Sequence, residues 1–492
     1  MKKINLILSA LIIAGLAIPF AGCAEDNEKT VTLRVSSWEE YIDLGGWDEV
    51  IDLESGDIFG ENSMVDDFTE WFNENHDYKV KVEYSTFGTN EDLYNRLSLG
   101  DTYDLVCPSD YMIMKLLAED KLEKYSEEFL ESGTYTQNVS PYIAQVYKDY
   151  GWTEYAACYM WGTSGFVYNP EKLVNDWDIS SCEILLNPDY NRAVTIKDNV
   201  RDAYFATLSI IYNGELTAGN LTSEQLSAYL NDTASETIER AEDVLKEIKE
   251  NVYSFETDSG KADMVTGKVV ANYQWSGDAV YIMDEADADG TELWYSVPEE
   301  CSNLWFDGWV MLKDGIKGDR KKQEVAEAFV DFLAQPENAI RNMYYIGYTS
   351  SIATDTVFEY MEWNYGAEGQ DTVDYDLSYF FGDESAVLSA DAENFELDES
   401  GINRGRQLFA QYPPQNVIDR SVVMLDFGDK LSQINQMWIN VRCPDLKDVS
   451  PAVWGVVGGI AGASAIAVCL YIFRHRIFFT YRPRKGYVKV EK

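Results

Sequence analysis

The chain has 492 residues, more than one ordinary domain, and 46% of them are hydrophobic, enough for large cores. It carries 85 acidic and 39 basic residues, which gives a formal net charge of −46. Because nucleic-acid binding requires a basic surface, this charge argues against a nucleic-acid partner. The negative field favours cationic ligands, although an acidic surface that serves only solubility fits equally well.

Cysteine and histidine are too sparse for several kinds of site. The seven cysteines are scattered and form no Cys-x-x-Cys pair, so the sequence indicates neither a zinc site nor a disulfide framework. Only two histidines are present, His76 and His475. A Ser-His or Cys-His hydrolase and a His-ligated metal centre are therefore disfavoured, and we expect no metal and no cofactor.

The N-terminus has the pattern of a secretory signal peptide over residues 1–22. Two lysines precede an apolar run from Ile4 to Phe20, and small residues then lead to Cys23. The segment Ala21-Gly22-Cys23 resembles a bacterial lipobox, which implies that Cys23 becomes the lipidated first residue of the mature protein. Ordinary cleavage near Ala24 is the alternative.

The C-terminus predicts a second membrane anchor. Residues 452–473 form an apolar run long enough to span a bilayer, and residues 474–492 form a basic tail. The excess of Arg and Lys places the tail in the cytoplasm and residues 24–450 outside the cell, so we expect a protein held at the extracytoplasmic face of the membrane.

The pattern of the exported part, residues 24–450, predicts an α/β protein of two lobes. Strand and helix patterns alternate from Thr30 onward, which predicts a mainly parallel sheet, and ligands of such sheets bind beyond the carboxyl ends of the strands. The segments Trp38–Tyr41 and Ser109–Tyr111 lie at such ends. We expect lobe 1 at about 30–155 and 306–350, and lobe 2 at about 156–305 and 351–445. An aperiodic acidic insert is expected at 362–403, and a helix at 422–438.

Two short segments combine Trp with Asp. Trp275 is followed by Asp278, and Trp305 by Asp307, and each pair is predicted to follow a strand that breaks at its Trp. An indole face beside a carboxylate suits an organic cation, because the ring attracts the ammonium group and the carboxylate accepts charge-assisted hydrogen bonds. Taken alone, these residues could equally be core Trp and turn Asp.

A set of motifs occurs in one order between Val31 and Tyr348, and it closely resembles the spermidine/putrescine-binding proteins of ABC transporters. The motifs are Trp38-x-Glu40-Tyr41, Tyr84-Ser-Thr, Tyr103-Asp-Leu-Val-Cys-Pro-Ser109-x-Tyr111, Trp161-Gly, Arg201-Asp202, Trp275-Ser-Gly-Asp278, Trp305-x-Asp307, Leu333-Ala-Gln-Pro336 and Ile346-Gly-Tyr348. The resemblance implies a two-lobed type II periplasmic-binding-protein fold that closes around a linear polyamine and delivers it to the permease subunits of the transporter.

The same resemblance assigns the ligand-binding residues in three groups. It implies aromatic walls from Trp38, Tyr41, Trp275 and Trp305, ammonium-binding carboxylates from Glu40, Asp202, Asp278 and Asp307, and hydroxyl or ring contacts from Ser109, Tyr111, Thr257 and Tyr348. Asp278 resembles the putrescine-preferring pattern, and the late glutamine of spermidine binders has no clear counterpart near Met424. Two alternatives remain at this level: an extracellular glycosidase with paired carboxylates, and a membrane-anchored cation sensor.

Overall fold

The computed structural model describes residues 30–219, 221–300, 302–398 and 401–443. The chain divides into two compact units, residues 1–431 and 432–492. In the second unit the structure describes residues 432–443, most of which belong to helix α20 (Leu431–Arg442). The predicted signal peptide (1–22), the lipidation site Cys23, the membrane helix (452–473) and the tail (474–492) lie outside the described residues.

A mixed sheet forms the framework of the first unit. Strand β1 (Thr30–Trp38) is parallel to β4 (Lys79–Phe87) and to β5 (Leu105–Val106). The order then continues through two antiparallel neighbours, β12 (Ser302–Leu312) and β7 (Ala156–Tyr168). The expected alternation of strand and helix is confirmed here, but the sheet is mixed rather than mainly parallel, because β12 returns from a distant part of the chain and runs against β5.

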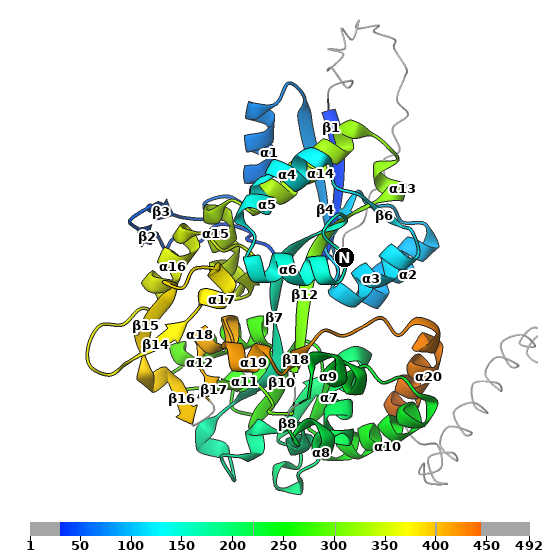
Figure 1. Ribbon diagram of the computed structural model, residues 1–492, viewed down its shortest axis with the longest axis vertical. Coiled ribbons are helices and arrows are strands. Elements are labelled where there is room, and N and C mark those ends of the chain that lie inside the picture. Colours follow the sequence, from blue (N-terminus) through cyan, green and yellow to red (C-terminus); the bar gives the residue numbers. More distant parts are fainter. Residues whose placement is uncertain (1–29, 220, 301, 399–400, 444–492) are drawn as a thin grey trace, which may run out of the picture. The chain divides into compact units, whose positions relative to one another are not determined.

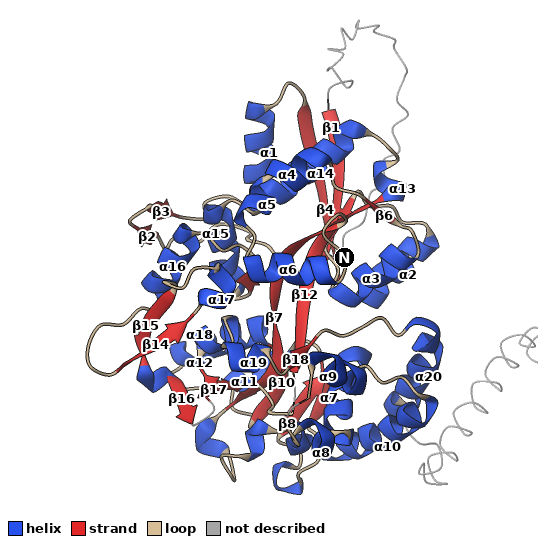
Figure 2. Cartoon of the chain, viewed as in Figure 1, coloured by secondary structure: helices blue, strands red, loops and turns tan. Residues whose placement is uncertain are grey.

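Strands β7 and β12 are long and pair with each other, and β7 continues into a second region of the sheet (Figure 2). Every residue of both strands is buried, which matches their nearly continuous apolar and aromatic sequence. Their pairing shifts register between Asp307 and Gly308, a β-bulge. The predicted strand break at Trp305 is therefore wrong: β12 continues through Trp305, and the bulge lies two residues later.

The second sheet region is built on the other end of β7. Strands β10 (Ala271–Trp275) and β11 (Trp294–Ser296) pair with β7 on its two sides. The region is extended by parallel pairing to β8 and β9 on one side, and by antiparallel pairing to β17 and β16 on the other. The bounds of these four are β8 Val194–Lys197, β9 Ser254–Glu256, β16 Phe395–Asp398 and β17 Gly401–Gly405. Besides β5, three more two-residue strands pair with β12 or β7: β6 Leu122–Glu123, β13 Thr349–Ser350 and β18 Ser421–Val422.

Helices pack against both regions (Figures 1 and 2). Local capping sets several of their starts: Thr89 accepts a hydrogen bond from the backbone N–H of Asp92, and Thr222 and Gln225 form a reciprocal capping box. The helices that precede residue 350 are α1 Met64–Asn75, α2 Asn90–Leu99, α3 Asp110–Ala118, α4 Glu127–Ser132, α5 Thr134–Asn138, α6 Pro141–Asp149, α7 Val200–Ile211, α8 Asn213–Leu216, α9 Ser223–Leu230, α10 Ser235–Asn251, α11 Ser259–Val265, α12 Ser276–Ala288, α13 Lys313–Ile316, α14 Arg320–Leu333 and α15 Pro336–Ile346.

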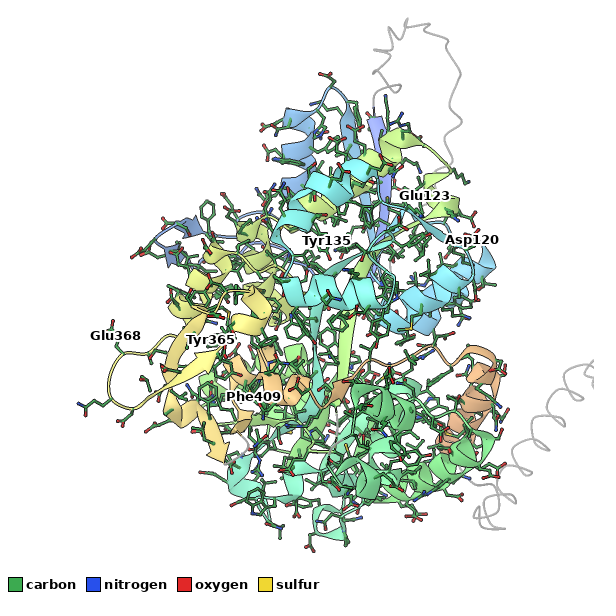
Figure 3. All side chains as sticks on the ribbon, in the orientation of Figure 1. Asp120, Glu123, Tyr135, Tyr365, Glu368 and Phe409 are labelled. Atoms are coloured by element: carbon green, nitrogen blue, oxygen red, sulfur yellow. The ribbon has the colours of Figure 1, made fainter. Side chains whose placement is uncertain are left out.

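The described residues between 362 and 403 form regular elements, so the prediction of an aperiodic segment is wrong. The segment begins in the last turn of α16 (Asp355–Tyr365) and contains the hairpin of β14 (Thr372–Asp376) with β15 (Val387–Asp391), as well as β16 and the start of β17. Tyr375 and Phe380 are buried, whereas Glu368 in the preceding loop is exposed (Figure 3). Charged residues at the turns interrupt the apolar pattern, so periodicity did not indicate these short elements. The remaining helices here are α17 Ser378–Phe381, α18 Gln407–Gln411 and α19 Gln415–Ile418.

The helix predicted over 422–438 is shorter than expected. Val422 ends strand β18, residues 423–427 are extended or coil, and α20 begins only at Leu431. Among the described residues, no helix combines the length and apolar character required to cross a membrane.

Candidate functional site

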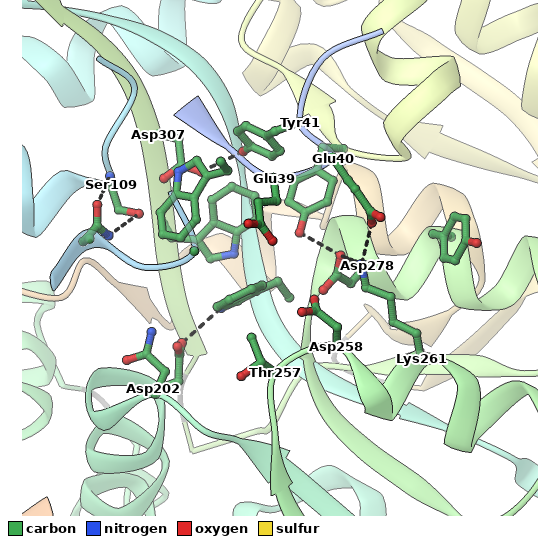
Figure 4. Close-up of a pocket in the computed structure, with 18 of the residues that line it drawn as sticks. Glu39, Glu40, Tyr41, Ser109, Asp202, Thr257, Asp258, Lys261, Asp278 and Asp307 are labelled. Carbon is green, nitrogen blue, oxygen red and sulfur yellow. Dashed lines mark hydrogen bonds and ion pairs between the residues drawn. The ribbon is translucent and has the colours of Figure 1, made fainter. Parts of the chain in front are cut away.

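A pocket of about 580 Å³ is lined by residues from both sheet regions (Figure 4). All the ligand-binding residues predicted from the sequence line it: Trp38, Glu40, Tyr41, Ser109, Tyr111, Asp202, Thr257, Trp275, Asp278, Trp305, Asp307 and Tyr348. They come from strand ends, helix starts and the β12 bulge, at points up to 310 residues apart in the sequence, a separation that follows from Trp38 and Tyr348. The fold thus brings the whole predicted set together around one cavity.

The loop that follows β1 supplies one wall. Strand β1 ends at Trp38, and Glu40 adopts a left-handed backbone conformation with φ of 51°, which is uncommon for a residue other than glycine. This turn sends the Tyr41 side chain into the interior, where it is 4% exposed, and leaves the Glu40 side chain in solvent. Tyr41 contacts the Tyr348 ring edge-on, with centroids 5.0 Å apart. The two rings form a rigid aromatic surface beside the cavity.

Asp307 lies at the β12 bulge and is 6% exposed. Its Oδ2 accepts a hydrogen bond of 2.7 Å from the Tyr41 hydroxyl, whereas its buried Oδ1 has no hydrogen-bond partner in the described part of the chain. Burial raises the pKa of Asp307 to about 6, and the hydroxyl groups of Ser109 and Tyr41 oppose this rise. A buried carboxylate with a free acceptor oxygen favours a positively charged hydrogen-bond donor.

Asp202 and Trp275 meet on the opposite wall. Asp202 lies in the first turn of α7, and Trp275 ends β10 immediately before α12. The indole Nε1 donates a hydrogen bond of 3.2 Å to Asp202 Oδ1. Burial raises the pKa of Asp202 to about 6, although this hydrogen bond and the positive charge of Lys197 act in the other direction. The predicted break at Trp275 is confirmed, since the strand does end there.

Asp278 differs from these two carboxylates, because two lysines pair with it. Lys197 Nζ lies 3.4 Å from Asp278 Oδ2, and Lys261 Nζ lies 3.1 Å from Oδ1, which also accepts a hydrogen bond of 2.9 Å from Tyr348. Burial opposes ionisation of Asp278, but Lys197 and Lys261 hold its pKa below the ordinary value. Neither lysine was identified from the sequence, because each lies in a polar or alternating segment where an exposed side chain is the usual outcome.

Ser109 and Tyr111 lie at the start of α3 and share one partner. The side-chain amide of Asn90 donates hydrogen bonds to the Ser109 hydroxyl (3.1 Å) and to the Tyr111 hydroxyl (2.8 Å). Arg201 places its guanidinium carbon 3.7 Å from the centre of the Tyr111 ring. Asn90 and Arg201 also line the pocket. The sequence motifs included Arg201 without a role, and Asn90 was missed because its function depends on a fold contact 21 residues away.

The remaining predicted residues divide between the pocket and the core. Trp305 is anchored by a hydrogen bond of 3.0 Å from Nε1 to the Thr163 carbonyl, and Trp38 lies against Phe87, with centroids 5.0 Å apart. Thr257 and Met424 line the cavity. Trp161 and Trp309, by contrast, are buried in the core.

The match to known protein families decides the class. Residues 64–364 match the family model for bacterial extracellular solute-binding proteins, which is more than half of the chain. The chain belongs to this family. Its members are binding proteins rather than enzymes, so the glycosidase alternative is not supported, and the predicted α/β periplasmic-binding-protein fold is confirmed.

Individual relatives confirm the resemblance inferred from the motifs. The solute-binding protein is 26% identical over 331 residues to the spermidine/putrescine-binding periplasmic protein of Salmonella typhimurium, covering 67% of this chain and 79% of the relative. It is 24% identical over 350 residues to a putrescine-binding periplasmic protein of Pseudomonas aeruginosa, covering 68% and 82%.

Two solved structures share the fold of the solute-binding protein. The spermidine/putrescine ABC transporter substrate-binding protein of Streptococcus pneumoniae superposes with a TM-score of 0.52 at 22% identity, covering 83% of this chain and 99% of that structure. The Tp0655 lipoprotein of Treponema pallidum gives a TM-score of 0.56 at 17% identity, covering 84% and 99%.

The lining of the pocket carries an excess of negative charge. Eight acidic side chains line it, against Arg201 and Lys261. Across the described residues, no cluster of three or more His, Cys, Asp or Glu side chains is placed to hold a metal ion. In this solute-binding protein the pocket is lined mainly by carboxylates, aromatic rings, hydroxyl groups and amides, together with the cations Arg201 and Lys261.

Proposed function

We propose that this solute-binding protein captures a linear polyamine, spermidine or putrescine, outside the cell and delivers it to the permease of an ABC importer. The observation that carries the proposal is the state of Asp202 and Asp307. Both are buried, both have a raised pKa, and neither has a lysine or arginine within ion-pair distance among the residues described. An ammonium group at each carboxylate removes the cost of burying an unpaired charge.

The aromatic side chains account for the rest of the ligand. The methylene chain of a polyamine is apolar and its ends are cationic, so the indole and phenol rings of Trp38, Tyr41, Trp275 and Trp305 suit both parts. The hydroxyl groups of Ser109, Tyr111, Thr257 and Tyr348 complete the polar lining, and Glu40 adds negative charge at the rim. Micromolar binding requires about −8 kcal/mol, which two charged hydrogen-bonded contacts and two aromatic contacts supply after ordering costs.

Binding is coupled to closure of the two lobes at the boundaries predicted from the sequence. Asp307 and Tyr41 belong to one predicted lobe, and Asp202 and Trp275 belong to the other. A ligand that contacts both groups interacts more strongly with the closed state than with the open one, and this difference in affinity shifts the equilibrium toward closure.

Isothermal titration calorimetry of the full-length protein in detergent tests the proposal. Putrescine and spermidine are each expected to give saturable heat, and neutral oligosaccharides of similar length none. The proposal is contradicted if the oligosaccharides bind and neither amine gives binding heat at millimolar concentration.

The protein is further proposed to be anchored at both ends, through lipidated Cys23 and a membrane helix at residues 452–473. Cys23→Ala alone is expected to leave the protein in the membrane fraction, and truncation after Ser450 combined with Cys23→Ala is expected to release it. Uptake should survive truncation after Ser450 alone. A loss of uptake with normal ligand binding would instead support the sensor or coupling role for the helix.

A further inference from the structure

The three buried carboxylates of the pocket are not equivalent. Asp278 has a cation at each oxygen, with Lys197 Nζ at 3.4 Å and Lys261 Nζ at 3.1 Å, and it also accepts a hydrogen bond from Tyr348. Its charge is therefore satisfied by the protein itself. Asp202 and Asp307 have no such cation within ion-pair distance in the described ranges, and Asp307 retains a buried oxygen without any hydrogen-bond donor.

The two lysines hold Asp278 in different ways. Lys197 is 1% exposed, donates a hydrogen bond of 2.7 Å to the Thr257 carbonyl and lies 4.1 Å from the centre of the Trp275 ring. It is a fixed part of the wall. Lys261 comes from α11, is 20% exposed and lines the cavity itself (Figure 4). Because Lys261 contacts both the pocket and solvent, its ammonium group is the one that a ligand could replace.

Lys261 also lies close to the rim. Its Nζ is 3.9 Å from Glu40 Oε2, and the Glu40 side chain is 88% exposed. This second contact is a solvent-exposed ion pair, which contributes little to binding energy. The strong interaction of Lys261 is with buried Asp278, so the lysine occupies the position at which a third ammonium group of a ligand would otherwise be bound.

We infer that Lys261 fills a third cation position next to Asp278 and thereby restricts the pocket to ligands with two ammonium groups, diamines rather than triamines. The inference rests on the proposed polyamine function. The two open carboxylates, Asp202 and Asp307, take the ends of a diamine. A triamine leaves its third ammonium group beside the positive charge of Lys261, or must displace Lys261 from Asp278.

The test compares putrescine with spermidine by titration calorimetry at one ionic strength, on the full-length wild type, Lys261→Met and Lys261→Gln. In either neutral variant the ratio of spermidine affinity to putrescine affinity is expected to rise about tenfold or more, the change that one buried charged contact produces. Putrescine affinity is expected to rise less than spermidine affinity, because the two ammonium groups of putrescine already bind at Asp202 and Asp307 and only the third ammonium group of spermidine gains a new carboxylate.

Two control variants separate charge from packing. Lys261→Arg keeps the positive charge and is expected to retain the wild-type ratio. Lys268→Met removes a lysine whose ion pair with Asp263 lies at the surface, and it is expected to change nothing. An unchanged ratio in both neutral variants, or a ratio in Lys261→Arg that equals theirs, overturns the inference while the polyamine function stands. Absence of heat from both amines in the wild type overturns the proposed function instead.

Discussion

Asp307 offers the sharpest test of the pocket, because Asp307→Asn has opposite effects on the free and the liganded protein. In the free protein, burial raises the pKa of this carboxyl from 3.8 to about 6. A shift of that size means that the ionised group costs about 3 kcal/mol of stability at neutral pH, and an amide avoids this cost. Part of the gain is lost, since the hydrogen bond from Tyr41 then has a neutral acceptor, worth about 1 kcal/mol less.

The liganded state responds in the other direction. Removal of a buried charged partner weakens binding by about 2–4 kcal/mol, a factor of about 30 to 1,000 in Kd. Ligand at 100 times its Kd stabilises the wild type by about 2.7 kcal/mol, and at the same concentration a variant that binds about 100-fold more weakly gains only about 0.4 kcal/mol. We therefore expect Asp307→Asn to melt no lower than wild type without ligand, and to lose nearly all of the rise in Tm with putrescine.

Differential scanning fluorimetry with and without putrescine measures both effects. Asp331→Asn is the matched control, because burial also raises the pKa of Asp331 to about 6 but this residue does not line the pocket. It is expected to keep the wild-type response to putrescine. A normal ligand response in Asp307→Asn, or a marked loss of stability without ligand, would refute the reasoning.

Three further outcomes are expected. Trp275→Ala removes a ring face and a hydrogen-bond donor to Asp202, so calorimetry should show putrescine affinity reduced about ten- to a hundredfold. Trp275→Phe keeps a ring and should lose less affinity. Equal affinities in the wild type and both variants would place the ligand elsewhere. Asp202 and Asp307 have a pKa near 6 in the folded protein against 3.8 when unfolded. Their contribution to stability is therefore largest below about pH 4 and is lost as the pH rises through about 6. Putrescine affinity depends on the ionised carboxylates, so it should fall as the pH drops below about 6. Urea denaturation at about pH 5 and about pH 7.5 measures the change in stability, and calorimetry at the same pH values measures the change in putrescine affinity. Putrescine binding without proton release at the lower pH would contradict the assignment. Arg201→Ala removes a buried guanidinium held between two aromatic rings and should lower the free energy of unfolding by about 2–4 kcal/mol in urea. For the exposed Arg240, the change Arg240→Ala is expected to cost less than about 1 kcal/mol.

The sequence determined the class of elements and the residue types of the pocket. Alternating apolar residues indicate β1 and β4, helical spacing indicates α1, and the pair Thr222 and Gln225 indicates the start of α9. These patterns involve residues close together in the sequence, so they can be recognised without knowledge of the fold. The ordered motifs then identified residues that the structure gathers around one cavity.

Tertiary structure alone decided which pocket carboxylates pair with a lysine of the protein. Lys197 and Asp278 are 81 residues apart, and no local pattern indicates that they meet. The continuity of β12 through Trp305 depends on pairing with β7, and the hairpin within 362–403 depends on burial of Tyr375 and its neighbours. Periodicity reports which face of an element is apolar, whereas charge balance in a pocket depends on side chains that distant segments bring into contact.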